Sequence, residues 1–204
     1  MYRIVKRFLD LLLSCSGCVL LWPLLLVLTI AVKLDSRGPI LFLQERIGRN
    51  GKHFNILKFR TMRVDAPHDI PTHMLKDPEK WITRTGKFLR KTSIDELPQL
   101  FNILRGDMSI VGPRPALWNQ EDLIAARARY QGRWGLTPNN LRPGLTGWAQ
   151  INGRDELDIV KKAVYDGEYA RRISFLFDLR CFIGTFRSVA AQEGVVEGGT
   201  GRKP

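Results

Sequence analysis

The sequence predicts a mostly helical α+β protein with an N-terminal membrane helix, a short β-hairpin and several amphipathic helices around one compact domain. Three observations support this fold class. Residues 11–32 carry no charged side chain, as in the runs of about 20 apolar residues that cross a hydrocarbon core as a helix. Two short apolar runs around a glycine turn follow, and beyond residue 84 apolar residues recur mostly at helical spacing. We expect a membrane helix at 1–34, the domain at 35–190 and a disordered, glycine-rich tail at 191–204.

The apolar run is predicted to remain in the protein, because it is longer than the apolar part of a signal peptide and no cleavage site follows it. Basic residues flank both of its ends, namely Arg3, Lys6 and Arg7 before it and Lys33 and Arg37 after it. Basic flanks favour the cytoplasm, so a spanning helix places one cluster outside, whereas a re-entrant helix keeps both inside. Pro23 supplies a cause for a bend. A kinked spanning helix and a re-entrant helix fit these residues equally well.

The first elements of the domain are predicted to be two strands. The apolar residues 40–44 and 54–60 flank a turn at Gly48, Asn50 and Gly51, which is the pattern of a β-hairpin. Residues 64–81 contain three prolines and mixed charge, and we expect them to form a surface insertion.

Helices and turns are predicted to alternate in the rest of the chain. One helix covers 85–104 and ends at Gly106, and a second covers 121–130. The rigid turn Gly-Pro-Arg-Pro at 112–115 separates them, and a loop at 142–147 follows. The last helical region, 157–189, carries a strongly apolar face beside several arginines. This face suits a helix at a membrane interface and a helix packed in the core equally well.

The composition narrows the possible partners. Lys and Arg outnumber Asp and Glu by 32 to 20, which gives a formal net charge of +12 and predicts anionic partners such as nucleic acid, phospholipid headgroups or phosphorylated substrates. Three cysteines and three histidines indicate neither a disulfide framework nor a histidine-rich metal centre. A membrane-tethered nucleic-acid or acidic-protein binder remains an alternative, but the interleaved aromatic and basic residues typical of a nucleic-acid-binding sheet are missing from the sequence.

The pair Asp95 and Glu96 is the most informative candidate site. Ser93 and Glu96 have the spacing of a capping box, which explains acidic residues at a helix N-terminus without any catalytic role. Pro98 favours a different arrangement, in which the helix begins at Leu97 and both carboxylates lie in the entering turn. There, one carboxylate is placed to attack phosphorus and the other to hold Mg²⁺ against diphosphate oxygens.

Cations that could bind phosphate are spread over the domain. The candidates are Lys58, Arg60, Arg90, Lys91, Arg114, Arg142 and Arg154, several of them beside proline or glycine turns. An arginine in a rigid loop makes a good bidentate phosphate clamp because little ordering entropy is left to lose. For each arginine taken alone, a solvated surface role fits the sequence better than phosphate binding.

Taken together and in order, the motifs resemble the bacterial sugar transferase family, the monotopic phosphoglycosyl transferases, over nearly the whole chain. They are Lys6-Arg7-Phe8-Leu9-Asp10, Gly38-Pro39-Ile40-Leu41-Phe42 with Gln44, Arg46 and Gly48, Lys58-Phe59-Arg60-Thr61-Met62, Asp95-Glu96-Leu97-Pro98-Gln99-Leu100, Gly106-Asp107-Met108-Ser109, Val111-Gly112-Pro113-Arg114-Pro115, Arg142-Pro143-Gly144-Leu145-Thr146-Gly147 and Asn152-Gly153-Arg154. One departure is Trp22 before Pro23, where family members often have serine. It affects the geometry of the helix break and not the expected membrane insertion.

The resemblance implies a re-entrant helix and a catalytic domain on the cytoplasmic face of the bacterial inner membrane, with both termini in the cytoplasm. It implies that Asp95 attacks the β-phosphate of a UDP-sugar, expelling UMP, and that polyprenyl phosphate then takes the phosphosugar. Glu96 corresponds to the family's Mg²⁺ ligand, Arg114 to a phosphate-binding residue, and Lys58, Arg90 and Asp166 to charged residues of the active site.

The same resemblance also sets our expectations for partners, oligomeric state and chain form. Membrane phospholipids are expected partners, nucleic acid is not, and an oligomer is possible. The short chain suggests a minimal catalytic form without the extra N-terminal membrane region of longer members. A membrane phosphatase or nucleotide-sugar hydrolase that uses Asp95 with water as the acceptor is the remaining alternative.

Overall fold

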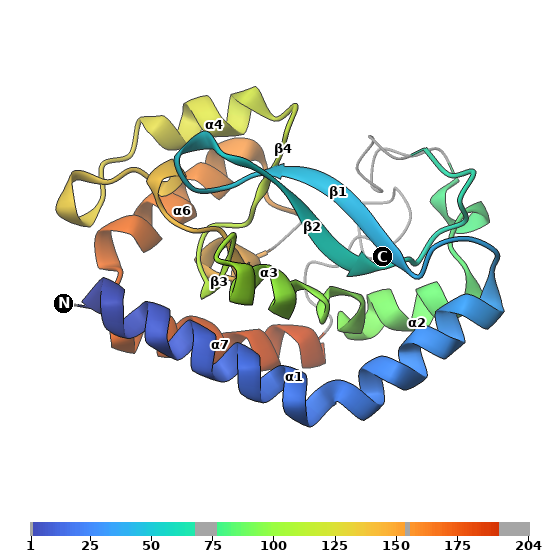
Figure 1. Ribbon diagram of the computed structural model, residues 1–204. Coiled ribbons are helices and arrows are strands. Elements are labelled where there is room, and N and C mark those ends of the chain that lie inside the picture. Colours follow the sequence, from blue (N-terminus) through green and yellow to red (C-terminus); the bar gives the residue numbers. More distant parts are fainter. Residues whose placement is uncertain (1, 68–76, 154–155, 192–204) are drawn as a thin grey trace.

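The structure is a computed structural model that describes residues 2–67, 77–153 and 156–191. Half of the predicted insertion, all but the first residue of the predicted tail, and Arg154 therefore lie outside the described residues. In Figure 1 a long N-terminal helix runs beneath a body of shorter helices and two small sheets. The expected mostly helical α+β class is confirmed.

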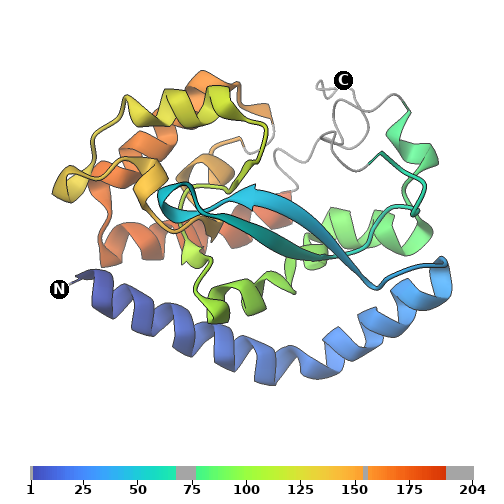
Figure 2. The same ribbon diagram turned by 45° about the horizontal axis from the view of Figure 1, so that its top comes forward.

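Helix α1 (Tyr2–Asp35) is continuous and contains Pro23. It is long and apolar enough to cross a membrane, and many of its apolar side chains are exposed, among them Leu12, Leu20, Trp22 and Val27. Burial of such side chains in lipid is favourable because apolar surface leaves water. In both views α1 bends in its middle, and both of its halves rise from that bend toward the body (Figures 1 and 2).

Two buried carboxylates attach α1 to the body. Asp10 accepts hydrogen bonds from the Ser109 hydroxyl at 2.8 Å and the Ile110 backbone N–H at 2.9 Å. Asp178, from the last helix, accepts from Tyr2 at 2.5 Å and from Lys6 at 2.7 Å. Buried carboxylates need such donors, because an unpaired charge is costly away from water. The basic and acidic residues just before the apolar run therefore have a structural role.

The predicted hairpin is confirmed. Strands β1 (Leu41–Ile47) and β2 (His53–Phe59) pair antiparallel, with Leu41 opposite Phe59. The short strand β4 (Ala116–Leu117) adds to the other edge of β1. A second sheet joins β3 (Ser109–Val111) and β5 (Gly144–Thr146) in parallel. The sequence did not indicate β3, β4 or β5, and the predicted loop at 142–147 contains β5.

Two of the three helical predictions need correction, and one is confirmed. The predicted helix at 85–104 is two helices, α2 (Arg84–Thr92) and α3 (Gln99–Arg105), although α3 does end at Gly106 in the left-handed conformation. The predicted helix at 121–130 is confirmed as α4 (Glu121–Ala128). The last helical region is also two helices, α6 (Ile159–Arg172) and α7 (Phe175–Ala191), and a short helix α5 (Trp148–Ile151) precedes them.

The apolar residues of helix α7 fall into two groups, one packed in the core and one exposed. Phe177 and Cys181 are buried in the main core with Ile103, Met108 and Tyr169. The apolar side chains of Phe175, Leu176, Leu179, Ile183 and Phe186 are exposed instead. The helix therefore packs on the core with one side and presents an apolar surface with the other.

Candidate active site

Asp95 and Glu96 lie in a 3₁₀ turn, Ile94–Glu96, between α2 and α3. Ser93 breaks the helix because its backbone is left-handed, with φ of 57°, a conformation that a non-glycine residue seldom adopts. Pro98 follows as the N-cap residue of α3. The prediction that both carboxylates lie in the turn entering this helix is confirmed, with the helix beginning two residues later than expected.

The capping-box interpretation of Ser93 and Glu96 is wrong. The Ser93 side chain makes no capping hydrogen bond in this turn, and the Glu96 carboxylate points to cations from other elements. Its Oε1 accepts from Lys58 Nζ at 2.7 Å and from Arg114 Nη2 at 3.3 Å. Only 7% of Glu96 is exposed. Low exposure strengthens these charge-assisted hydrogen bonds relative to those in water.

Three parts of the chain meet at this carboxylate. Lys58 comes from β2, Arg114 from the turn between β3 and β4, and Glu96 from the turn before α3. Burial lowers the pKa of Lys58, and the positive Arg114 lowers it further, while the negative Glu96 and then Asp95 oppose the shift. The effect of Asp95 on Lys58 indicates that both carboxylates contribute to the electrostatics of the site.

A buried ion pair holds the backbone of Arg114. The Arg127 guanidinium donates to Asp166 Oδ2 at 2.6 and 2.8 Å, and it donates to the Arg114 carbonyl oxygen at 2.8 Å. Burial raises the pKa of Asp166, and the positive Arg127 opposes that shift. Asp166 was predicted to be an active-site residue, and the structure places it behind the site, where it acts on Arg114 through Arg127. Nothing in the sequence pointed to Arg127 as part of this arrangement.

The glycines of two motifs explain why the Arg114 turn lies where it does. A Cβ atom on Gly112 would lie 2.5 Å from the Arg142 carbonyl oxygen, and one on Gly144 would lie 2.1 Å from the Gly112 nitrogen. A side chain at either position would therefore separate the backbones of β3 and β5. The close approach fixes the position of Arg114, two residues after Gly112.

The other predicted cations are divided among several places. Arg90 donates to the Thr61 hydroxyl at 2.8 Å, joining α2 to the end of β2. Arg60 is buried, and its guanidinium donates to Ser36 and to the carbonyl oxygens of residues 36 and 37, which closes the turn after α1. Arg142 donates to the Gly106 carbonyl oxygen at 3.0 Å and lines a pocket beside the start of α1. Arg154 lies outside the described residues.

A carboxylate shared by a lysine and an arginine, with a second carboxylate beside it, provides both signs of charge for phosphoryl transfer. The cations can bind phosphate oxygens, and the carboxylates can supply a nucleophile and a ligand for Mg²⁺. Within the described residues there is no cluster of three or more histidine, cysteine or acidic side chains that could hold a metal ion by itself. Mg²⁺ does not need such a cluster, because one or two carboxylates and substrate phosphates commonly suffice.

This chain belongs to the bacterial sugar transferase family, whose sequence model matches residues 1–192. It is 42% identical over 191 residues to the undecaprenyl-phosphate glucose phosphotransferase of Komagataeibacter xylinus, which covers 89% of this chain and 35% of that protein. It is 40% identical over 198 residues to the UDP-glucose:undecaprenyl-phosphate glucose-1-phosphate transferase of Xanthomonas campestris pv. campestris, covering 94% of this chain and 40% of that protein.

The chain therefore spans about two fifths of the length of these two relatives. A relative of similar size is the uncharacterized sugar transferase EpsL of Bacillus subtilis (strain 168). The two are 40% identical over 197 residues, covering 94% of this chain and 90% of that protein.

Proposed function

We propose that this protein transfers a phosphosugar from a UDP-sugar to polyprenyl phosphate and releases UMP. The observation that carries the proposal is the convergence of Lys58 and Arg114 on Glu96, next to Asp95 on the same turn. The relative from Xanthomonas is named for a UDP-glucose donor and an undecaprenyl phosphate acceptor, and nucleotide sugar and lipid phosphate are the two substrate classes that such a site suits.

The reaction proceeds in two steps through Asp95. A carboxylate oxygen of Asp95 attacks the β-phosphorus of the UDP-sugar, the bond between that phosphorus and the bridging oxygen breaks, and UMP leaves with the electron pair. A phosphate oxygen of the polyprenyl phosphate then attacks the same phosphorus. The bond to Asp95 breaks, which restores the carboxylate and yields a polyprenyl diphosphate sugar. A covalent intermediate suits this pair of substrates, because the water-soluble donor and the lipid acceptor can react one after the other.

Lys58 and Arg114 bind phosphate oxygens as negative charge develops, which stabilises the transition state. Arg127 and Asp166 hold the Arg114 backbone, so this cation is positioned before the substrate arrives. Glu96, together with the substrate phosphates, fits a Mg²⁺ ion, which would neutralise diphosphate charge when bound. Arg90, Arg60 and Arg154 stay proposed ligands of substrate phosphate, whereas Arg142 lies in the pocket beside the start of α1.

The membrane arrangement is part of the proposal. We place α1 as a re-entrant helix of the inner membrane with both ends on the cytoplasmic side, supported by its bend and by basic residues at both ends. The exposed apolar side of α7 then contacts the same leaflet. The site opens to cytosolic UDP-sugar while the polyprenyl tail remains in lipid.

The test measures UMP release from a panel of UDP-sugars, beginning with UDP-glucose, in nanodiscs that contain undecaprenyl phosphate and Mg²⁺. The proposal predicts UMP together with a lipid-linked sugar, and loss of both in Asp95→Asn. Full activity of Asp95→Asn would refute the assigned nucleophile. Release of free sugar phosphate without any lipid acceptor would instead identify a nucleotide-sugar hydrolase.

A further inference from the structure

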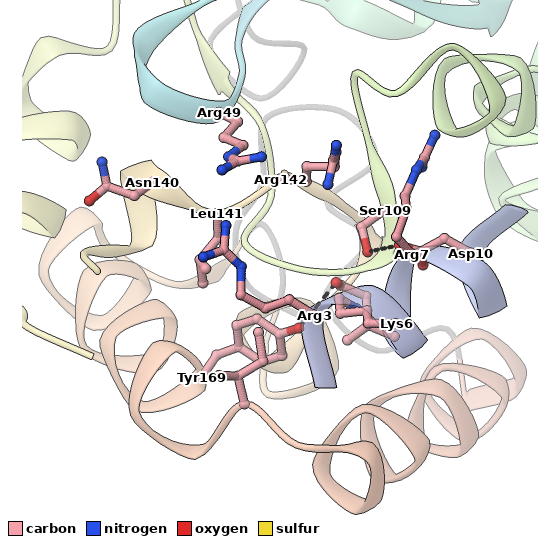
Figure 3. Close-up of a pocket in the computed structure, with 12 residues that line it drawn as sticks. Arg3, Lys6, Arg7, Asp10, Arg49, Ser109, Asn140, Leu141, Arg142 and Tyr169 are labelled. Carbon is pink, nitrogen blue, oxygen red and sulfur yellow. Dashed lines mark hydrogen bonds between the residues drawn. The ribbon is translucent and has the colours of Figure 1, made fainter. Parts of the chain in front are cut away.

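A second basic site lies at the N-terminal end of α1. Five cationic side chains line one pocket there: Arg3, Lys6 and Arg7 from α1, Arg49 from the turn between β1 and β2, and Arg142 from the segment before β5. Figure 3 shows them gathered around this pocket from the three elements. Among the described residues that line it, Asp10 is the one carboxylate.

Within the described residues, the positive charge of this pocket is only partly balanced. Both oxygens of Asp10 are occupied by Ser109 and Ile110, and Lys6 is paired with Asp178. Among the described residues, Arg7 donates to neutral acceptors alone, the carbonyl oxygens of Met108 and Leu104, each at 3.4 Å. Within the described part of the chain, none of the four arginines of the pocket forms an ion pair.

The arginines also act on one another. Burial lowers the pKa of Arg49, and the positive Arg142 and Arg3 lower it further. Burial likewise lowers the pKa of Arg142. The positive Arg7 and Arg3 lower it further, and the negative Asp10 opposes the shift. The Nε atom of Arg49 is buried without a hydrogen-bond partner among the described residues. Like charges held together in this way favour the binding of an anion.

The place of the pocket along α1 indicates where the anion comes from. Asp10 immediately precedes the uncharged run that starts at Leu11, so the pocket lies beside the point where α1 enters the apolar layer. Phosphate groups of membrane lipids lie at this depth, and arginine clusters beside a membrane helix suit them. Exposed Ile4 and Phe8 flank the same end of the helix and can contact the lipid chains.

We propose that this pocket binds the phosphate group of an anionic phospholipid. The proposal goes beyond the transfer reaction, because the pocket does not include Asp95, Glu96, Lys58 or Arg114. Guanidinium groups bind phosphate oxygens through paired, charge-assisted hydrogen bonds. A bound headgroup would supply the negative charge that the pocket lacks and would fix the start of α1 at the membrane surface.

The experiment measures binding by the full chain in a non-ionic detergent, from the rise in Tm as a short-chain lipid is titrated. Dihexanoylphosphatidylglycerol is expected to bind, and dihexanoylphosphatidylcholine, with no net charge, is expected to bind much more weakly. The Arg3→Gln/Arg49→Gln double variant is expected to bind the anionic lipid about tenfold more weakly or worse, the change caused by losing one charge-assisted hydrogen bond. The control Arg63→Gln/Arg129→Gln removes two exposed charges elsewhere and is expected to bind like the unchanged protein.

Three results would overturn the proposal: equal binding of both lipids, unchanged binding by Arg3→Gln/Arg49→Gln, or binding of inorganic phosphate as tight as that of the anionic lipid. The last result would assign the pocket to a free anion. The variant Arg3→Lys/Arg49→Lys keeps the charge and is expected to retain most of the affinity, which separates a binding defect from misfolding. Asp95→Asn is expected to lose transfer but keep lipid binding, so failure of the transfer proposal is distinguishable from failure of this one.

Discussion

The two basic regions of this protein differ in how their charges are balanced. At the Asp95–Glu96 turn, Lys58 and Arg114 share one buried carboxylate, and Arg127 with Asp166 holds the arginine backbone. In the pocket at the start of α1, four arginines lack a carboxylate partner within the described residues. The first arrangement fixes its cations before a ligand arrives, which suits chemistry. The pocket at the start of α1 needs a bound anion to balance its positive charge, which suits ligand binding.

Among the predictions that follow, Glu96→Gln is expected to have the largest effect, a loss of transfer activity at the Asp95–Glu96 turn. The change removes the charge that Lys58 and Arg114 share and one proposed Mg²⁺ ligand, so we expect transfer to fall by about 10²- to 10³-fold. Initial rates of UMP release over a range of Mg²⁺ concentrations measure it. The control is Glu45→Gln, which alters an exposed pair with His53. A rate within a factor of two or so of the unchanged protein at every Mg²⁺ concentration would exclude this role for Glu96.

Arg127→Met tests whether the buried pair supports the site. The change leaves the Asp166 charge buried without its partner, and we expect the free energy of unfolding to fall by about 3–5 kcal/mol. Chemical denaturation in detergent micelles measures it. Arg127→Met/Asp166→Leu removes both charges and is expected to recover most of that stability while transfer stays low, because the Arg114 carbonyl still lacks its donor. Recovery of transfer together with stability would show that Arg127 does not position Arg114.

Asp178→Asn tests the attachment of α1 beside the second region. The Asp178 carboxylate accepts from Tyr2, Lys6 and Tyr169, and its loss is expected to lower the free energy of unfolding by about 1–3 kcal/mol. Denaturation together with protease cleavage near residue 7 measures whether the start of α1 detaches. The exposed control Asp65→Asn is expected to change stability by less than about 0.5 kcal/mol. Equal, small effects of the two changes would contradict the attachment.

The smallest expected effect is a pH shift from Lys58. Its pKa is lowered, so Lys58 loses its proton below the ordinary lysine value of about 10.4. Transfer is expected to decline on the alkaline side below that pH, and Lys58→Arg is expected to move the decline upward. Between the lowered pKa and the ordinary one the unfolded chain binds more protons, so this group makes the free energy of unfolding rise with pH there. An alkaline limb that is the same in Lys58→Arg would assign the decline to another group.

Local patterns predicted the hairpin, α4 and the turn that carries both carboxylates, because each depends on neighbouring residues. The break at Ser93 was missed, since a left-handed serine is not a local preference. Strands β3 and β5 were missed because three-residue strands gain their stability from a partner far along the chain.

The residues of the candidate site were likewise predicted where local motifs sufficed and missed where distant contacts decide. Asp95, Glu96, Lys58 and Arg114 follow from residue type and motif. Arg127 lies in a helix that the sequence predicts, but only the fold reveals its pairing with Asp166. Arg142, predicted to bind substrate phosphate, faces the pocket at the start of α1, because its motif packs against β3 and not against the carboxylate turn.

The most direct test of the central claim is the intact mass of the protein after incubation with Mg²⁺ and a reactive UDP-sugar in the absence of lipid acceptor. The covalent mechanism predicts an added phosphosugar, formed with no more than one UMP per protein chain, lost on addition of polyprenyl phosphate and absent in Asp95→Asn. An adduct that persists in Asp95→Asn, or UMP that forms only when both substrates are present and never with an adduct, would contradict it.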